Sequence, residues 1–192
     1  PFPPVDYFNN LVNFLEIFHD MPEQMIEPKI DYEDWQPEEL QYDPNNETAI
    51  PERILQTLEE DNCCILQGPP GTGKSYTIAH IIAKYLTSNK TVCVTTMANK
   101  GLVELVQQPP LLPFLRDGKI FKSNLSADER RMVPGLKPIK KGFVVPNGEL
   151  FCSTNYVLSQ AYNSDCLSKE ELPSYDLIII EEASQAFLAS IL

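Results

Sequence analysis

The sequence Gly68-Pro69-Pro70-Gly71-Thr72-Gly73-Lys74-Ser75 decides the fold prediction, because it satisfies in full the spacing G-x-x-x-x-G-K-S/T of a phosphate-binding loop. An apolar run at residues 63–67 predicts a strand before it, and a helical pattern at residues 74–88 follows it. A loop of this kind turns its backbone N–H groups inward around phosphate oxygens, and the positive end of the next helix points at the same place. We therefore predict that all eight residues bind the phosphates of a nucleotide.

Lys74 and Ser75 carry the chemistry of this loop. The ammonium group of Lys74 would neutralise the β- and γ-phosphates, and the hydroxyl of Ser75 would ligate Mg²⁺, a hard ion that prefers oxygen ligands. The structural alternative is a glycine-rich turn that caps a helix and is followed by Lys and Ser by chance. The complete motif in its strand-to-helix setting favours the nucleotide site.

A second motif spans residues 177–185, where an apolar strand ends abruptly in Glu181 and Glu182. The two carboxylates would lie at the carboxyl edge of a parallel sheet, where α/β proteins bind ligands and where the phosphate-binding loop also lies. We expect Glu181 to hold Mg²⁺ directly or through water, and Glu182 to orient or deprotonate the attacking water in an in-line phosphoryl transfer. Without the loop, a solvated acidic turn would be the better interpretation.

The remaining pattern predicts strands and helices in alternation, which is typical of a parallel sheet with helices on both faces. Strands are expected at 91–95, 119–122, 150–153 and 177–180, and helices at 50–60 and 100–107. Residues 124–148 interrupt the alternation with Pro and Gly, and we interpret them as an inserted excursion that could contain a hairpin. Residues 1–45 form a separate acidic arm, with an amphipathic helix expected over residues 8–18.

Charge and composition set limits on partners and compartment. The net charge of −12 is uneven: residues 1–61 hold 16 acidic and 2 basic residues, whereas residues 84–141 hold 11 basic and 4 acidic ones. The basic surplus, which includes Lys119, Lys122 and Arg130, could face phosphates or simply be solvated.

No apolar stretch approaches the ~20 residues that cross a bilayer, so no membrane partner is expected. Five cysteines without a Cys-x-x-Cys pair favour a reducing, intracellular compartment, the cytoplasm or the nucleus, with the cysteines of the apolar runs in buried strands.

The loop and the Glu-Glu-Ala-Ser-Gln sequence at 181–185 together resemble the superfamily 1 helicases related to the nonsense-mediated-decay RNA helicase and to senataxin. The resemblance implies a RecA-like α/β P-loop NTPase fold over residues 46–192, an incomplete first motor domain, with ATP and Mg²⁺ as cofactors. It also implies that Gln185 couples the γ-phosphate to nucleic acid, and that residues 92–100 and 151–155 correspond to the family's motifs Ia and Ib. The polar side chains that we carry over as contacts to single-stranded DNA or RNA are Thr96, Asn99, Ser153 and Thr154.

Three features depart from the family pattern. Glu181 stands where the family has Asp, and its extra methylene moves the carboxylate outward by about one bond length. No Gln follows Asn45 in the segment where the family places the Gln that reads adenine. The chain ends seven residues after Gln185, so we expect a piece of a larger protein whose missing motor domain is its partner. In this family the second motor domain supplies an arginine that stabilises the negative charge of the transition state. The piece alone is therefore expected to be weakly active or inactive.

These observations predict an ATP-dependent helicase or translocase that moves on DNA or RNA. Two alternatives stay open. One is a P-loop ATPase that remodels protein complexes without touching nucleic acid. The other is a degenerate nucleotide-binding scaffold, which Glu181 and the missing Gln would favour.

Overall fold

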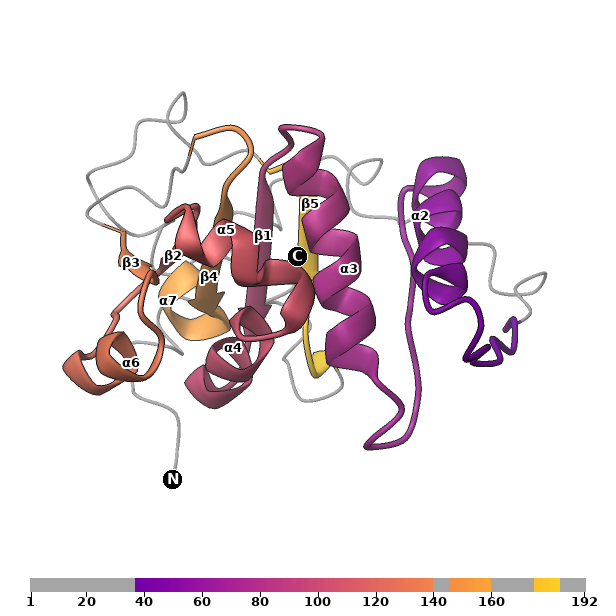
Figure 1. Cartoon of the computed structure of the whole chain (residues 1–192), viewed down its shortest axis with the longest axis horizontal. Helices are drawn as coiled ribbons and strands as arrows, with labels where there is room; N and C mark the ends of the chain where they lie inside the picture. Colours follow the sequence, from indigo (N-terminus) through magenta and orange to yellow (C-terminus); the bar gives the residue numbers. More distant parts are fainter. Residues whose placement is uncertain (1–36, 140–145, 160–174, 184–192) are drawn as a thin grey trace, which may run out of the picture.

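The fold is built on a five-stranded sheet in which every described pairing is parallel (Figure 1). The computed structural model describes residues 37–139, 146–159 and 175–183. The strand order is β3-β2-β4-β1-β5, with β1 (Val92–Thr96), β2 (Ile120–Lys122), β3 (Lys137–Pro138), β4 (Leu150–Thr154) and β5 (Leu177–Ile180). The predicted α/β class is confirmed, and four of the predicted strands agree with the structure to within one residue at each end.

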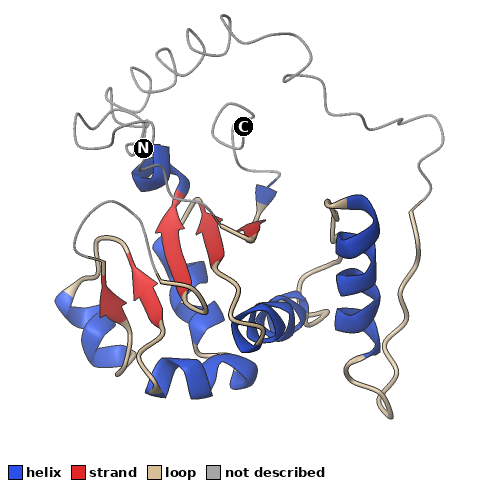
Figure 2. Cartoon of the chain, turned by 90° about the horizontal axis from the view of Figure 1, so that it is seen from above, coloured by secondary structure: helices blue, strands red, loops and turns tan. Residues whose placement is uncertain are grey.

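Helices provide the rest of the alternation. They are α2 (Ala49–Asp61), α3 (Lys74–Thr87), α4 (Asn99–Val106), α5 (Leu112–Arg116), α6 (Ala127–Met132) and α7 (Asn155–Ser159), with a 3₁₀ turn, η2 (Pro109–Leu111). In both Figure 1 and Figure 2, α3 lies between α2 and the sheet. The first three of these helices confirm the ones expected at 50–60, 74–88 and 100–107, again to within one residue.

The two faces of the sheet are covered unequally (Figure 2). On β1, Val92 and Val94 face a large apolar core shared with α3, α4 and α5, whereas Cys93 faces a smaller cluster with Phe151. This alternation follows from the period of two along a strand. On the second face, Leu158 of α7 packs against the smaller cluster. Both faces are thus covered, as predicted, but the main core of the described residues lies on the side of α3, α4 and α5.

The strand predicted at residues 63–67 is wrong. These residues have no strand pairing, Cys63 is exposed, and Ile65 is 71% exposed. A strand needs a hydrogen-bonded neighbour, and the sheet of the described residues ends at β5, which pairs with β1 alone. The apolar run indicated a segment suited to a strand but could not indicate its neighbour. Of the four cysteines expected in buried strands, Cys93 of β1 and Cys152 of β4 are buried. Cys63 is exposed and Cys64 is half-buried, and neither lies in a strand.

The described part of the excursion contains α6 and β3, and the hairpin that the excursion could contain is not found among its described residues. β3 pairs with β2 in parallel, with Phe121 opposite Lys137, so the two strands do not form a hairpin. Ser126 starts α6 with a capping box: its hydroxyl accepts the backbone N–H of Glu129, and the Glu129 carboxylate accepts the backbone N–H of Ser126. The Ser-x-x-Glu spacing therefore marks a helix start that apolar periodicity alone does not reveal.

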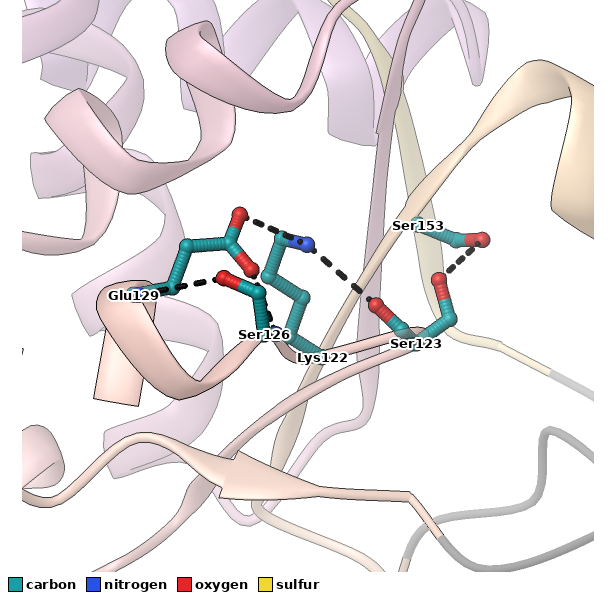
Figure 3. Close-up of polar contacts among 5 residues, drawn as sticks. All are labelled: Lys122, Ser123, Ser126, Glu129 and Ser153. Carbon is teal, nitrogen blue, oxygen red and sulfur yellow. Dashed lines mark hydrogen bonds and ion pairs between the residues drawn. The ribbon is translucent and has the colours of Figure 1, made fainter.

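Glu129 also pairs with Lys122, the last residue of β2 (Figure 3). Lys122 Nζ lies 3.1 Å from Oε1 of Glu129, and the two side chains are 1% and 13% exposed. The same Nζ donates to the carbonyl of Ser123 at 3.2 Å, and the hydroxyls of Ser123 and Ser153 share a hydrogen bond of 2.9 Å. Lys122 therefore joins α6 to the sheet and is not part of a basic surface, which corrects the prediction that it could face phosphates.

Several predictions fall on residues outside the described ranges. One is the helix expected at residues 8–18 of the acidic arm, since only residues 37–45 of that arm are described. Another is the role of Gln185. The boundary between residues 45 and 46 also stays a prediction. In the part of the chain that the structure describes, no helix combines the length and the apolar character that crossing a bilayer requires.

Candidate nucleotide site

The phosphate-binding loop leads directly into the N-terminus of α3. Gly73 is the residue before the helix and has a φ of 80°, a left-handed conformation that a side chain would strain. The first turn of α3 contains no acidic residue, so its positive end is not neutralised from within the helix. The helix N-terminus is therefore placed where a phosphate group can bind, as the motif predicts.

Lys74 folds back onto the loop. Its Nζ donates hydrogen bonds to the backbone carbonyls of Gly68 at 2.5 Å and Pro69 at 2.8 Å. The hydroxyl of Thr72 donates to the same Pro69 carbonyl at 2.9 Å. The acceptors are uncharged backbone oxygens, so they hold the ammonium group without neutralising it. Phosphate oxygens would replace them, because an ionised acceptor makes the stronger hydrogen bond.

The loop meets the second motif through Ser75 and Glu181. β5 ends at Ile180, and the backbone N–H of Glu181 still donates to the carbonyl of Thr95 at 2.9 Å, which holds the start of the turn against β1. Ser75 Oγ donates to Oε1 of Glu181 at 3.4 Å. The structure thus brings together two residues 106 positions apart that the sequence predicts as the Mg²⁺ ligands.

The carboxylate of Glu181 has one weak hydrogen bond in the described chain. Its Oε2 is buried and has no hydrogen-bond partner among the described residues, and Oε1 has the long contact with Ser75. Burial is the main cause that raises the pKa of Glu181, and the charge of Glu182 raises it further. The hydrogen bond from Ser75 and the charge of Lys74 lower the pKa by less. A cation beside Glu181 would stabilise the ionised carboxylate and so offset the cost of its burial.

These donors suit Mg²⁺. Ser75 and Glu181 offer a hydroxyl and a carboxylate, the oxygen ligands that this ion prefers. A cation would be stabilised beside Oε2 of Glu181, which has no hydrogen-bond partner among the described residues. The described residues contain no group of three or more His, Cys, Asp or Glu side chains that could hold a metal by themselves. The arrangement therefore fits an ion shared between one carboxylate, one hydroxyl and the phosphates of a nucleotide.

Glu182 follows in a left-handed backbone conformation, with a φ of 55° and an exposed side chain. Such a conformation is uncommon outside glycine and costs free energy. The turn leaves the Glu182 carboxylate in solvent next to Glu181. Gln185, the remaining predicted residue of this motif, lies outside the described residues.

The four residues predicted to contact nucleic acid differ in exposure. Thr96 and Ser153 are 1% and 0% exposed, so their side chains do not reach solvent. Ser153 takes part in the polar network of Figure 3. Asn99 is exposed at the start of α4, and Thr154 is partly exposed, with its Oγ1 accepting a backbone N–H of α7 at 3.4 Å. Their contact with a nucleic-acid strand stays a prediction.

Asn155 is a residue of this edge that the sequence reasoning missed. It is 2% exposed, its Oδ1 accepts a hydrogen bond from the hydroxyl of Thr95, and its Nδ2 donates to Sδ of Met97 at 3.4 Å. Asn155 thereby ties the end of β4 to the end of β1. The available signal is a polar residue directly after a buried strand, which marks the position but not the partner.

The parallel sheet, the glycine-rich loop at a helix N-terminus and the serine–carboxylate contact at the carboxyl edge define a P-loop nucleotide-binding protein. The chain belongs to the family Novel STAND NTPase 3, whose model matches residues 46–172. The match includes the loop and β1 to β4, and it ends before Glu181. No curated protein and no solved structure matches the chain.

Proposed function

We propose that the chain is part of the first motor domain of an ATP-dependent helicase or translocase, in which hydrolysis of ATP drives movement along DNA or RNA. The observation that carries the proposal is the position of Glu181. Its side chain contacts Ser75 of the loop, and its backbone is bonded to Thr95 at the end of β1. Thr95 is bonded in turn to Asn155 at the end of β4. A change at the nucleotide would therefore reach, through direct contacts, the two segments that resemble motifs Ia and Ib.

The chain's own residues divide the chemistry of an in-line phosphoryl transfer to water. Lys74 would exchange its carbonyl partners for the β- and γ-phosphates, beside the N-terminus of α3. Ser75 and Glu181 would hold Mg²⁺, which supplies positive charge to the phosphate oxygens. Glu182, exposed next to Glu181, would orient the attacking water and accept its proton.

A single-stranded nucleic acid is the proposed partner of this edge. Hydroxyl and amide contacts to the backbone position a strand without reading its bases, which suits a motor that steps along any sequence. Arg130 and Arg131 on α6 and Lys100 on α4 are exposed and contribute basic side chains. The proposal requires that Thr96 and Ser153, which are buried, become accessible or act only through neighbours such as Asn99.

The ATPase rate of the full-length protein, measured with and without single-stranded DNA or RNA at a stated salt concentration, tests the proposal. Stimulation by one nucleic acid is expected and would identify the track. Glu182→Gln is the matched control, because it removes the carboxylate and keeps the size. Its rate should fall to background while nucleotide binding persists. Hydrolysis that neither nucleic acid changes contradicts the helicase proposal.

A second candidate is a P-loop ATPase that remodels protein complexes. The family match supports the NTPase part of this candidate, because the family name specifies an NTPase. Basal hydrolysis that is lost in Glu182→Gln and unchanged by nucleic acid would support this candidate. Nucleotide binding without any hydrolysis would instead support the third alternative, a degenerate nucleotide-binding scaffold.

A further inference from the structure

Gly101 lies in the first turn of α4, two residues after the helix begins at Asn99. Its φ is not in the left-handed region, so the backbone does not require glycine at this position. Glycine inside a helix is less stable than alanine, because it loses more conformational freedom on folding. The presence of glycine at position 101 is therefore explained by the atoms that a side chain at this position would contact.

A side chain at position 101 would meet Glu181. A Cβ added to Gly101 would lie 3.1 Å from Oε2 of Glu181 and 3.8 Å from Oγ1 of Thr96. The first distance is shorter than an ordinary van der Waals contact, so the carboxylate would have to move by a few tenths of an ångström. Oε2 is also the buried oxygen that has no partner among the described residues. α4 thus approaches this oxygen closely because it carries no side chain there.

We propose that Gly101 is a positioning residue for Glu181: it leaves the room that this carboxylate, one methylene longer than Asp, needs in order to face Mg²⁺ and the nucleotide. The inference rests on the proposed function, but only on the part in which Glu181 helps to bind Mg²⁺ with a nucleotide. Mg²⁺ demands near-ideal octahedral geometry, so moving one oxygen ligand by a fraction of an ångström weakens binding. The absence of a side chain at Gly101 therefore compensates for the longer side chain of Glu181.

The first test compares Gly101→Ala with the wild-type full-length protein in binding a fluorescent ATP analogue, with Mg²⁺ and with EDTA. The affinity with Mg²⁺ should fall roughly tenfold, as for loss of an outer-shell partner of a metal, and the affinity in EDTA should not change. The melting temperature should stay close to the wild-type value, because the higher helix propensity of alanine is offset by the 3.1 Å approach of its Cβ to Oε2 of Glu181. A purely structural role for Gly101 would lower stability and would weaken nucleotide binding in EDTA as well as with Mg²⁺. Gln107→Ala, at the opposite end of α4, where the side chain is exposed, is the control and should bind like the wild type.

The second test introduces Glu181→Asp into both backgrounds. The shorter side chain avoids the added Cβ, so the double variant should bind the analogue with Mg²⁺ more tightly than Gly101→Ala alone. Losses that simply add in the double variant would overturn the inference, as would equal affinities for the wild type and Gly101→Ala. A wild-type protein whose nucleotide binding does not depend on Mg²⁺ would overturn the Mg²⁺ site together with the inference, which separates the two failures.

Discussion

Two carboxylates next to carboxyl ends of strands, Glu129 and Glu181, have opposite surroundings. Glu129 lies against Lys122 Nζ and accepts the backbone N–H of Ser126. Burial alone would raise its pKa, but the contacts with Ser126 and Lys122 outweigh burial and lower it. Glu181 accepts one long hydrogen bond, from Ser75, has one buried oxygen without a partner in the described chain, and has a pKa raised chiefly by burial.

The difference separates a carboxylate whose contacts stabilise the fold from one whose buried oxygen has no partner in the described chain. A buried charge with its partners in place is tolerated, whereas one without them costs stability until a cation arrives. Glu149 shows that an unpartnered oxygen is not sufficient evidence of a site. Its Oε2 is also buried without a partner in the described residues, and burial raises its pKa, but it lies before β4, at the amino end of the strand. Glu181 is distinguished by its contact with Ser75 of the loop.

The largest expected effect follows from Lys122→Ala. It removes the cation that pairs with Glu129, whose side chain is 13% exposed and keeps its hydrogen bond with Ser126. The unfolding free energy should therefore fall by about 3 kcal/mol, the lower end of the range for a broken buried pair. Urea unfolding followed by circular dichroism measures this loss. Arg131→Ala is the control on the same helix, because its pair with Asp128 has side chains 79% and 81% exposed and should contribute at most about 1 kcal/mol. A loss no greater than that of the control would mean that the buried pair does not hold α6 to the sheet.

Glu181→Gln should give the reverse outcome. Stability should stay constant or rise, because the variant removes a partly buried charge whose Oε2 has no hydrogen-bond partner in the described chain. Binding of a fluorescent ATP analogue with Mg²⁺ should weaken at least as much as when an outer-shell partner of a metal is lost, roughly 10–100-fold, or about 1.4–2.7 kcal/mol. Glu149→Gln is the matched control, and its binding should be that of the wild type. Equal losses in both variants would show that Glu181 has no special relation to the nucleotide.

Ser126→Ala should have a smaller effect, because it removes one half of the capping box and leaves the Lys122–Glu129 pair in place. The expected loss is about 1 kcal/mol of unfolding free energy, from the same urea titrations. Thr48→Ala provides the comparison: Thr48 precedes α2 but makes no side-chain capping bond, so its replacement should change stability less. Indistinguishable losses would argue against a stabilising cap at Ser126.

The smallest expected effect is on the pH dependence of stability, where the two carboxylates should act in opposite directions. The lowered pKa of Glu129 contributes stability that is present above its ordinary pKa of 4.5 and is lost as pH falls through the folded-state value. The raised pKa of Glu181 contributes stability that is present below 4.5 and is lost as pH rises through the folded-state value. Unfolding free energies of the wild type, Glu129→Gln and Glu181→Gln between about pH 3 and 7 measure both terms. Slopes of the same sign for the two differences from wild type would contradict the comparison.

The sequence predicts those parts of the fold that depend on local pattern. The strand at 177–180 and the helix after the loop follow from apolar periodicity and from the motif, and both are in place. Ser75 and Glu181 could be paired in advance, because the carboxyl ends of parallel strands share one edge. The edge site was therefore predictable from chain topology.

The remaining features depend on partners that a single sequence does not specify. Residues 63–67 have the composition of a strand but no neighbour in the described sheet. Lys122 looks like any other basic residue until Glu129 is brought against it by α6. Asn155 is an ordinary polar residue after a strand until Thr95 is beside it. In each case pattern fixes the position, and long-range packing decides the role.

The hydrogen bonds of Lys74 with its own loop would also affect which anions the loop binds. An incoming anion must displace two hydrogen bonds, to Gly68 and Pro69, before it gains the ammonium group. Inorganic phosphate or sulfate offers only a few oxygens in return, whereas a nucleoside triphosphate adds contacts along its whole length. The loop's carbonyls would thus compete with an incoming anion for the ammonium group, and this competition would favour a nucleoside triphosphate over a small anion.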